Sequence, residues 1–284
     1  MSKKKSMKYQ VQGELSDKLC IGQSRHKAKN EIENRKPQGI YSWSTYQNYV
    51  TACTAFGKWV KAEFKVSDIK IARNYVEDYL KMRIDKGLSA WTVSRDAAAL
   101  AKLYGCSITD FKVKVPQRKR GDVRRSRGEI KDFNEKKHHK LVEFCKGTGL
   151  RVSEIRMLKK ENIFYDGNTL VVFVEQGKGG KCRLVPVIEK YEKRVFEMSK
   201  EIRSDGERVF KEGEIPRRAP VHKYRAMYAK AQYERLARKE IPKSDRYVCR
   251  KDKAGIVYDK KALAEVSQML GHNRIDVVAG SYLY

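Results

Sequence analysis

Residues that can act together on a phosphate follow one another through the second half of the chain. The first is Arg151 in TGLRVSE, where a predicted turn opens a helix, because an arginine held there can bind a phosphate. The others are Lys178 in EQGKGGKCRLVP, His222 and Arg225 in HKYR, His272 in LGH, and Tyr282 near the chain end. Arginine remains charged, histidine exchanges protons near neutral pH, and a tyrosine hydroxyl can act as a nucleophile. This order of residue types predicts chemistry at a phosphate ester.

The motifs TGLRVSE, GKGGK, HKYR and LGH together resemble those of the tyrosine recombinases of the integrase family, which cut and rejoin DNA through a phosphotyrosine. The resemblance spans roughly residues 40–284 and depends on all four motifs standing in family order, because each motif is short. It implies that Arg151 and Arg225 hold the phosphate in the transition state. It also implies that His222 exchanges a proton with the attacking tyrosine.

The resemblance assigns roles to two further residues and excludes a cofactor. His272 would donate a hydrogen bond to the phosphate, and Lys178 would protonate the departing 5′ oxygen, with Lys181 and Arg183 as neighbouring alternatives. The 3′-phosphotyrosine product retains the bond energy, so that religation needs no nucleotide and no metal. The sequence contains neither a Walker-type loop nor an acidic metal cluster, and we expect no cofactor.

The nucleophile has three candidates near the chain end. The family's typical spacing from the LGH histidine would end on Ser281, with Tyr282 one residue later and Tyr284 two beyond that. We favour Tyr282, because in the family the nucleophile often precedes an apolar residue, here Leu283. Family members commonly extend past the tyrosine to dock on a neighbouring protomer, whereas two residues remain here, as expected for a truncated chain or a different assembly.

The composition predicts a polyanionic partner. The chain of 284 residues has 63 Lys and Arg against 35 Asp and Glu, a net charge of +28, and double-stranded DNA is the leading candidate. We expect a homo-oligomer, with a dimer on each DNA site and a tetramer on two paired sites. Whether an accessory DNA-bending protein takes part stays open. The six scattered cysteines indicate reduced thiols without a zinc site, and no signal peptide or membrane span is recognisable, so we expect a cytoplasmic, DNA-associated protein.

We predict a mainly α fold with a small β-sheet, consisting of a helical core-binding domain and an α+β integrase-type catalytic domain. The expected parts are a basic, flexible or partly helical arm (1–38), a helical DNA-binding domain (39–110), a basic linker (111–129) and the catalytic domain (130–284). The basic residues of the linker, expected to cross the DNA backbone, are Lys112, Lys114, Arg118, Lys119, Arg120, Arg124, Arg125 and Arg127.

Within the catalytic part, several elements are predicted by their local pattern. A helix should break at Gly147, Asp166-Gly167 should turn into a strand TLVVFVE, and GKGG should turn that strand back as a hairpin with Lys178 at its tip. Arg225 and His272 are separated by 46 residues, more than in compact family members, and RYVCRKDKAGIVYDK alternates like a second hairpin in this insertion. A last helix, KALAEVSQML, should end at Gly271 and leave His272 exposed.

Three functions remain compatible with these patterns. The favoured one is a site-specific recombinase or integrase of a mobile element. A type IB topoisomerase-like or resolvase enzyme would use the same chemistry without exchange between sites. A catalytically silent DNA-binding protein could retain the fold, and formation of a covalent protein–DNA adduct would distinguish it from both enzymes.

Overall fold

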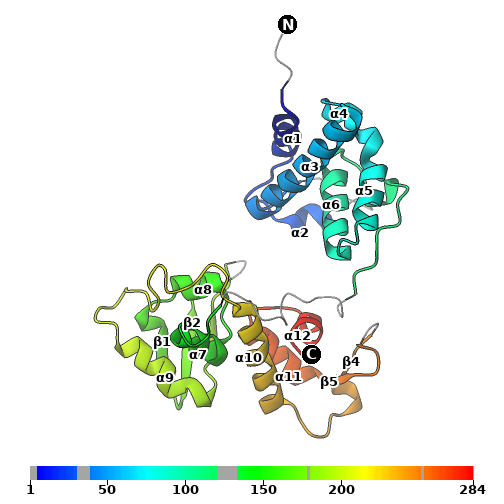
Figure 1. Cartoon of the computed structure of the whole chain (residues 1–284). Coiled ribbons are helices and arrows are strands. Elements are labelled where there is room, and N and C mark those ends of the chain that lie inside the picture. The colour runs from blue at the N-terminus through cyan, green and yellow to red at the C-terminus, as the bar shows by residue number, and fades with distance from the viewer. Residues whose placement is uncertain (1–4, 31–38, 120–132, 178–179, 251–252, 284) are drawn as a thin grey trace. The chain divides into compact units, whose positions relative to one another are not determined.

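The structure, a computed structural model, describes residues 5–30, 39–119, 133–177, 180–250 and 253–283. The chain divides into two compact units, Met1–Arg118 and Lys119–Tyr284 (Figure 1). Each unit has its own hydrophobic core. The division falls inside the segment predicted as a basic linker. Helices dominate both units, and the strands form small antiparallel sheets, so the predicted fold class is confirmed.

The regular secondary structure in the described residues of the first unit is helical, apart from one isolated bridge between Leu19 and Ile40. Its helices are α1 (Met7–Ser16), α2 (Arg25–Asn30), α3 (Trp43–Phe64), α4 (Ile69–Ala72), α5 (Val76–Asp85) and α6 (Ala90–Leu103). Ser42 and Ser89 act as N-caps, because their hydroxyls accept hydrogen bonds from the backbone of Thr45 and Thr92. Phe56 of α3 and Tyr79 of α5 lie in the core formed by the apolar faces that the helical spacing predicts.

The N-terminal segment is partly helical, as one of the two predicted alternatives has it, but residues 7–16 are packed into the core and are not a solvated tail. Met7, Val11 and Leu15 repeat every four residues, lie on one face of α1 and are buried against α3 and α6. Gln10 fixes the helix further, because its side chain donates to the carbonyl of Ser67 at 2.9 Å and accepts from the backbone of Ile69 at 2.9 Å. The segment therefore completes the core of the first unit.

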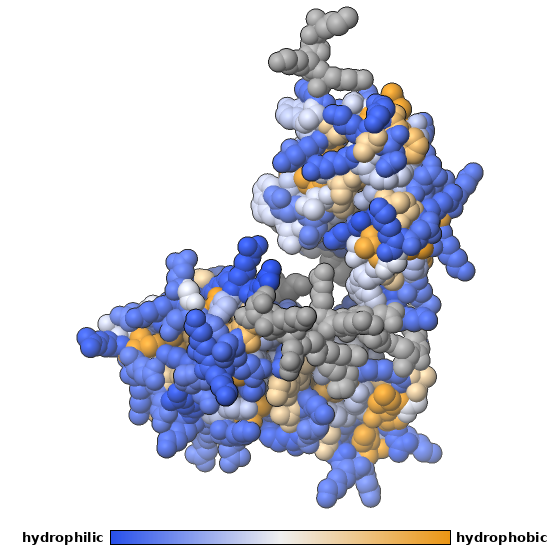
Figure 2. Space-filling view, in the orientation of Figure 1, coloured by the Kyte–Doolittle hydropathy of each residue, from blue (hydrophilic) through white to orange (hydrophobic). Residues whose placement is uncertain are grey.

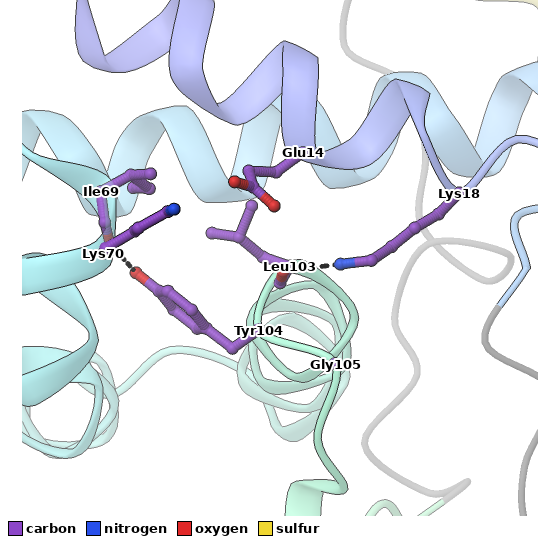
Figure 3. A pocket seen from close by; sticks show the side chains of 7 residues that line it. All are labelled: Glu14, Lys18, Ile69, Lys70, Leu103, Tyr104 and Gly105. Carbon is purple, nitrogen blue, oxygen red and sulfur yellow. Dashed lines mark hydrogen bonds between the residues drawn. The ribbon is translucent and has the colours of Figure 1, made fainter.

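Figure 3 shows how α1, α4 and α6 meet around a small groove. Lys18 donates hydrogen bonds of 2.8 Å to the carbonyls of Lys102 and Leu103, at the end of α6 where the helix dipole favours a cation. The hydroxyl of Tyr104 donates to the carbonyl of Ile69 at 2.9 Å, and burial raises its pKa. These contacts hold the first unit together.

The second unit combines helices with two small sheets. Its elements are α7 (His139–Thr148), α8 (Val152–Met157), β1 (Ile163–Asp166), β2 (Thr169–Val174), β3 (Arg183–Pro186), α9 (Glu189–Lys200), α10 (Val221–Leu236), β4 (Arg246–Val248), β5 (Val257–Asp259), α11 (Lys260–Met269) and α12 (Ile275–Ser281). Both predicted hairpins are present: β2 pairs with β3, and β4 pairs with β5, all antiparallel. Strand β1, which the sequence pattern did not reveal, completes the sheet β1-β2-β3.

Two helix boundaries differ from the prediction. Helix α7 does not break at Gly147; it continues to Thr148 and is capped by Gly149, whose φ of 59° is the left-handed conformation that glycine adopts easily. Gly147 instead allows close packing, since a Cβ there would lie 2.8 Å from Cβ of Tyr191. Helix α11 is not the last helix either, because the short α12 follows it and buries Val278 and Ala279.

Candidate active site

The structure brings four of the predicted residues together, Arg151, Arg225, His272 and Tyr282. Nε of Arg225 donates to the hydroxyl of Tyr282 at 3.2 Å, and Nε2 of His272 lies 3.3 Å from the same oxygen. Nη2 of Arg151 lies 3.4 Å from Nε2 of His272. These residues come from four places in the second unit, namely the start of α8, helix α10, the turn after α11 and the end of α12.

Arg151 occupies the N-cap position of α8, where the sequence pattern predicts it. Its Nη2 donates to the carbonyl of Leu270 at 3.0 Å, and its Nη1 donates to Oε1 of Glu154 at 2.7 Å. The carboxylate of Glu154 also accepts from the backbone N–H of Arg151 at 2.9 Å. Since 15% of the Arg151 side chain is exposed, its guanidinium can meet a ligand from solvent.

Glu154 and Arg183 support Arg151, a role that the sequence did not predict for either residue. Arg183 donates to Oε1 and Oε2 of Glu154 at 3.1 and 2.8 Å, and to the carbonyl of Met269 at 2.8 Å. The guanidinium of Arg183 is also tightly packed, because a Cβ at Gly177 or at Gly271 would lie within 3 Å of it. The spacing of three residues between Arg151 and Glu154 is the only sequence signal for this network.

Glu154 is a buried carboxylate that stays ionised. Burial raises its pKa, but hydrogen bonds from Arg183 and from the backbone and side chain of Arg151 outweigh that effect and lower the pKa below its ordinary value. The negative charge is therefore present at neutral pH beside two guanidinium groups. It balances part of the positive charge that gathers at the site.

Arg225 is almost completely buried, with 1% of its surface exposed. It donates to the carbonyls of Gly149 and Leu270, so that the carbonyl of Leu270 accepts from both Arg151 and Arg225. Burial lowers the pKa of Arg225, and the nearby phenol of Tyr282 opposes this effect. The position of this guanidinium is thus set by backbone atoms of the α7–α8 turn and of the α11 end.

His222 lies at the exposed start of α10, three residues before Arg225. Its pKa is lowered, first by partial desolvation and then by the positive charges of Arg225 and Arg151. The ring is therefore mostly neutral at pH 7, the form that can accept a proton. His272, which was expected to be exposed, is half-buried and faces the phenol of Tyr282, with ring centroids 5.7 Å apart.

Lys178 and Tyr284 lie outside the described residues. Of the alternatives to Lys178, Arg183 is engaged by Glu154 and Met269, whereas Lys181 is exposed and its carbonyl accepts from the backbone of Gly177 at 2.8 Å. Ser281 is the last residue of α12, and Tyr282 follows it as the C-cap. Tyr282 supplies the hydroxyl that Arg225 and His272 contact.

The basic residues predicted to cross DNA are only partly described. Lys112, Lys114, Arg118 and Lys119 are exposed, while the intervening Val113 and Val115 pack against the core of the first unit. Arg120, Arg124, Arg125 and Arg127 lie outside the described residues. On the face seen in Figure 2, hydrophilic side chains cover most of the surface, in keeping with the net charge of +28.

In the described part of the chain, we find no group of three or more His, Cys, Asp or Glu residues that could hold a metal ion. The six cysteines are free thiols. Among the described helices, none is long and apolar enough to cross a membrane.

Comparisons with known proteins identify the family and the fold. Residues 128–283 match the model of the phage integrase family. A protein of Sinorhizobium fredii named as an integrase/recombinase, y4qK, is 46% identical over 54 residues, a match that covers 19% of this chain and 17% of that protein.

Two solved structures share the fold at low sequence identity. The XerH site-specific recombinase in its post-cleavage complex with a palindromic difH substrate aligns with a TM-score of 0.53 and 12% identity over 98% of this chain and 91% of that one. The Tn1549 transposon integrase in complex with transposon right end DNA aligns with a TM-score of 0.50 and 14% identity over 92% and 93% of the two chains. Since the family model matches more than half of the chain, this protein belongs to the phage integrase family of tyrosine recombinases.

Proposed function

We propose that this chain is a site-specific recombinase or integrase of a mobile element, which cleaves and rejoins DNA through a 3′-phosphotyrosine at Tyr282. One observation carries the proposal: the hydroxyl of Tyr282 lies 3.2 Å from Nε of Arg225 and 3.3 Å from Nε2 of His272. A nucleophilic hydroxyl beside a guanidinium and an imidazole is the arrangement that attack on a phosphodiester requires.

The two arginines stabilise the transition state in this proposal. Attack of the phenol oxygen spreads additional negative charge over the non-bridging phosphate oxygens, which Arg151 and Arg225 can hold because guanidinium does not lose its proton. Each guanidinium has five N–H donors, and the protein carbonyls use only some of them. His272 adds a hydrogen-bond donor on the same side of Tyr282.

Proton transfer divides between two residues. The resemblance to the family assigns the phenol proton to His222, and its lowered pKa favours the neutral ring that can accept a proton. Lys178 donates a proton to the departing 5′ oxygen, with Lys181 as the alternative. The phosphotyrosine conserves the energy of the phosphodiester, so that a second 5′ hydroxyl can reverse the reaction on another strand without a nucleotide or metal.

Double-stranded DNA is the proposed partner. The net charge of +28 favours a polyanion such as DNA. Exposed cations that can bind its phosphate backbone are Lys112, Lys114, Arg118 and Lys119. Both solved structures of similar fold contain DNA. We further propose a dimer on each site and a tetramer on paired sites, since exchange between two duplexes requires four strand cleavages.

The decisive experiment traps the covalent intermediate. The chain is incubated with nicked duplexes that carry candidate element ends, and a denaturing gel reveals any protein-linked strand. Adduct should form with the unaltered chain, with Ser281→Ala and with Tyr284→Phe, but not with Tyr282→Phe, which loses only the hydroxyl. Adduct from Tyr282→Phe would overturn the proposed nucleophile. Absence of adduct from all chains that bind the DNA would favour the silent DNA-binding alternative.

A further inference from the structure

We propose that the inserted hairpin between α10 and α11 is a brace that positions Tyr282, with Lys253 and Tyr258 as its positioning residues. This inference rests on the proposed role of Tyr282 as the nucleophile. The insertion occupies residues 237–259 and contains β4 and β5. The sequence alone left open whether this segment touches DNA or a partner.

The hairpin donates hydrogen bonds to carbonyls on both sides of Tyr282. Nζ of Lys253 donates to the carbonyl of Ala279 at 2.9 Å and also to the carbonyl of Leu283. The hydroxyl of Tyr258 donates to the carbonyl of Leu283 at 3.1 Å. The backbone that carries the nucleophile is therefore held three residues before Tyr282 and one residue after it.

Helix α12 needs these external donors. It has seven residues, and a helix of this length is unstable alone because nucleation is unfavourable. The last carbonyls of any helix have no partner within it, and a cation at that end also interacts favourably with the helix dipole. The ammonium group of Lys253 both donates hydrogen bonds to carbonyls at this end of the helix and places a positive charge there. Leu283, with 4% of its surface exposed, anchors the same segment in the core.

The brace is itself attached to the helices that carry the other site residues. Arg238, just after α10, donates two hydrogen bonds of 2.7 Å to Asp259, and Asp259 caps the start of α11. The backbone N–H of Asp259 donates to the hydroxyl of Tyr233 in α10 at 2.8 Å, and the ring of Tyr233 packs edge-on against Tyr258 at 5.4 Å. Asp259 is fully buried, so its carboxylate is shielded from solvent.

This connection gives the insertion a mechanical purpose. Helix α10 carries Arg225, and α11 leads into His272, so a hairpin tied to both helices and to the end of α12 fixes the nucleophile relative to the groups that assist it. Catalysis is sensitive to such placement, since a misplacement of about 1 Å can cost on the order of a hundredfold in rate.

The test measures cleavage and binding separately in four variants. Lys253→Met keeps the apolar stem but removes the donor, Lys253→Arg retains a donor, and Tyr258→Phe removes one hydroxyl. Lys243→Met removes an exposed charge from the same insertion and serves as the matched control. Single-turnover formation of the covalent adduct is compared with DNA affinity, and amide hydrogen exchange is followed over residues 278–283 of the protein without DNA.

We expect adduct formation to fall by roughly tenfold or more in Lys253→Met and by less in Tyr258→Phe, with DNA affinity unchanged and amide exchange of residues 278–283 accelerated. Lys253→Arg should recover most of the rate, and Lys243→Met should behave like the unaltered chain. If Lys253→Met and Tyr258→Phe form adduct at the normal rate while Tyr282→Phe forms none, the brace is refuted and the proposed function stands. If Tyr282→Phe also forms adduct, the proposed function fails first.

Discussion

Arg183 and Glu154, 29 residues apart in the chain, form two parallel hydrogen bonds of 2.8 and 3.1 Å. The carboxylate of Glu154 is shared, because Arg151 also donates to it at 2.7 Å. One buried negative charge thus separates two guanidinium groups, and Arg225 brings a third close by. The network determines where Arg151 points before any phosphate arrives.

Replacement of Glu154 by glutamine should destabilise the second unit. Removal of the charge leaves Arg151 and Arg183 without their counter-ion, and the loss of one partner of a buried pair costs about 3 kcal/mol or more of the free energy of unfolding. Urea unfolding followed by circular dichroism would measure this change. Tryptophan fluorescence offers an internal control, since Trp43, Trp59 and Trp91 all lie in the first unit and should report an unchanged transition.

The same variant has a defined pH dependence. The folded-state pKa of Glu154 is lowered, so its contribution to stability is present above its unfolded pKa and is lost as the pH falls through the folded value. The stability difference between the unaltered chain and Glu154→Gln should therefore shrink on acidification. Glu234→Gln, at an exposed pair on α10, should change stability little at any pH.

Arg151 should prove necessary for cleavage and nearly dispensable for binding. Arg151→Ala should lower the rate of adduct formation on the order of a hundredfold or more, because it removes a donor from the transition state, while many other cations hold the DNA backbone. Lysine should not rescue it, since it lacks the planar pair of donors. A fully active Arg151→Lys enzyme would contradict the proposed clamp. Arg225 is a poorer choice for this test, because its side chain is buried and its loss also removes support from Gly149 and Leu270.

His222 should titrate below its ordinary pKa of 6.5 in the protein without DNA. Partial desolvation and the charges of Arg225 and Arg151 favour the neutral ring, so protonation requires a lower pH. The imidazole proton resonance, identified by its absence in His222→Gln, would report the titration. Arg151→Gln should raise this pKa toward 6.5, whereas Arg156→Gln, at an exposed position of the same helix, should not. A titration above the ordinary value would argue against the proposed proton acceptor.

The basic segment should contribute to DNA affinity in proportion to its charge. Simultaneous replacement of Arg118, Lys119 and Arg120 by alanine should weaken binding and reduce the slope of log affinity against log salt by about one unit for each DNA phosphate that the variant no longer neutralises. Affinity measured at several salt concentrations gives the slope. Alanine at the exposed Lys190, Lys193 and Lys200 of α9 removes an equal charge elsewhere. Equal effects from the two triple variants would mean that net charge, and not the linker, governs binding.

Local patterns in the sequence predicted much of the fold. Helices α3 and α6 follow from apolar residues at helical spacing, with Ser89 predicted as the cap of α6, and the turn between β1 and β2 follows from Asp166-Gly167. Each of these sequence patterns spans only a few residues, and over that range helix propensity and capping determine the local structure. The burial of α1 was not predicted, because a polar segment that carries only Met7, Val11 and Leu15 on one face shows no strong pattern until α3 covers it.

The sequence by itself determined the residue types and order of the site, from Arg151 through His272 to Tyr282, since these stand in short recognisable motifs. Only the tertiary structure decided how they are held. The pairing of Glu154 with Arg183, and the bonds from Lys253 and Tyr258 to the end of α12, join segments that are 25 or more residues apart. Such contacts leave no local periodicity or spacing, because the chain closes a long loop to form them and only the packing of α10, α11 and the sheet determines which side chains meet.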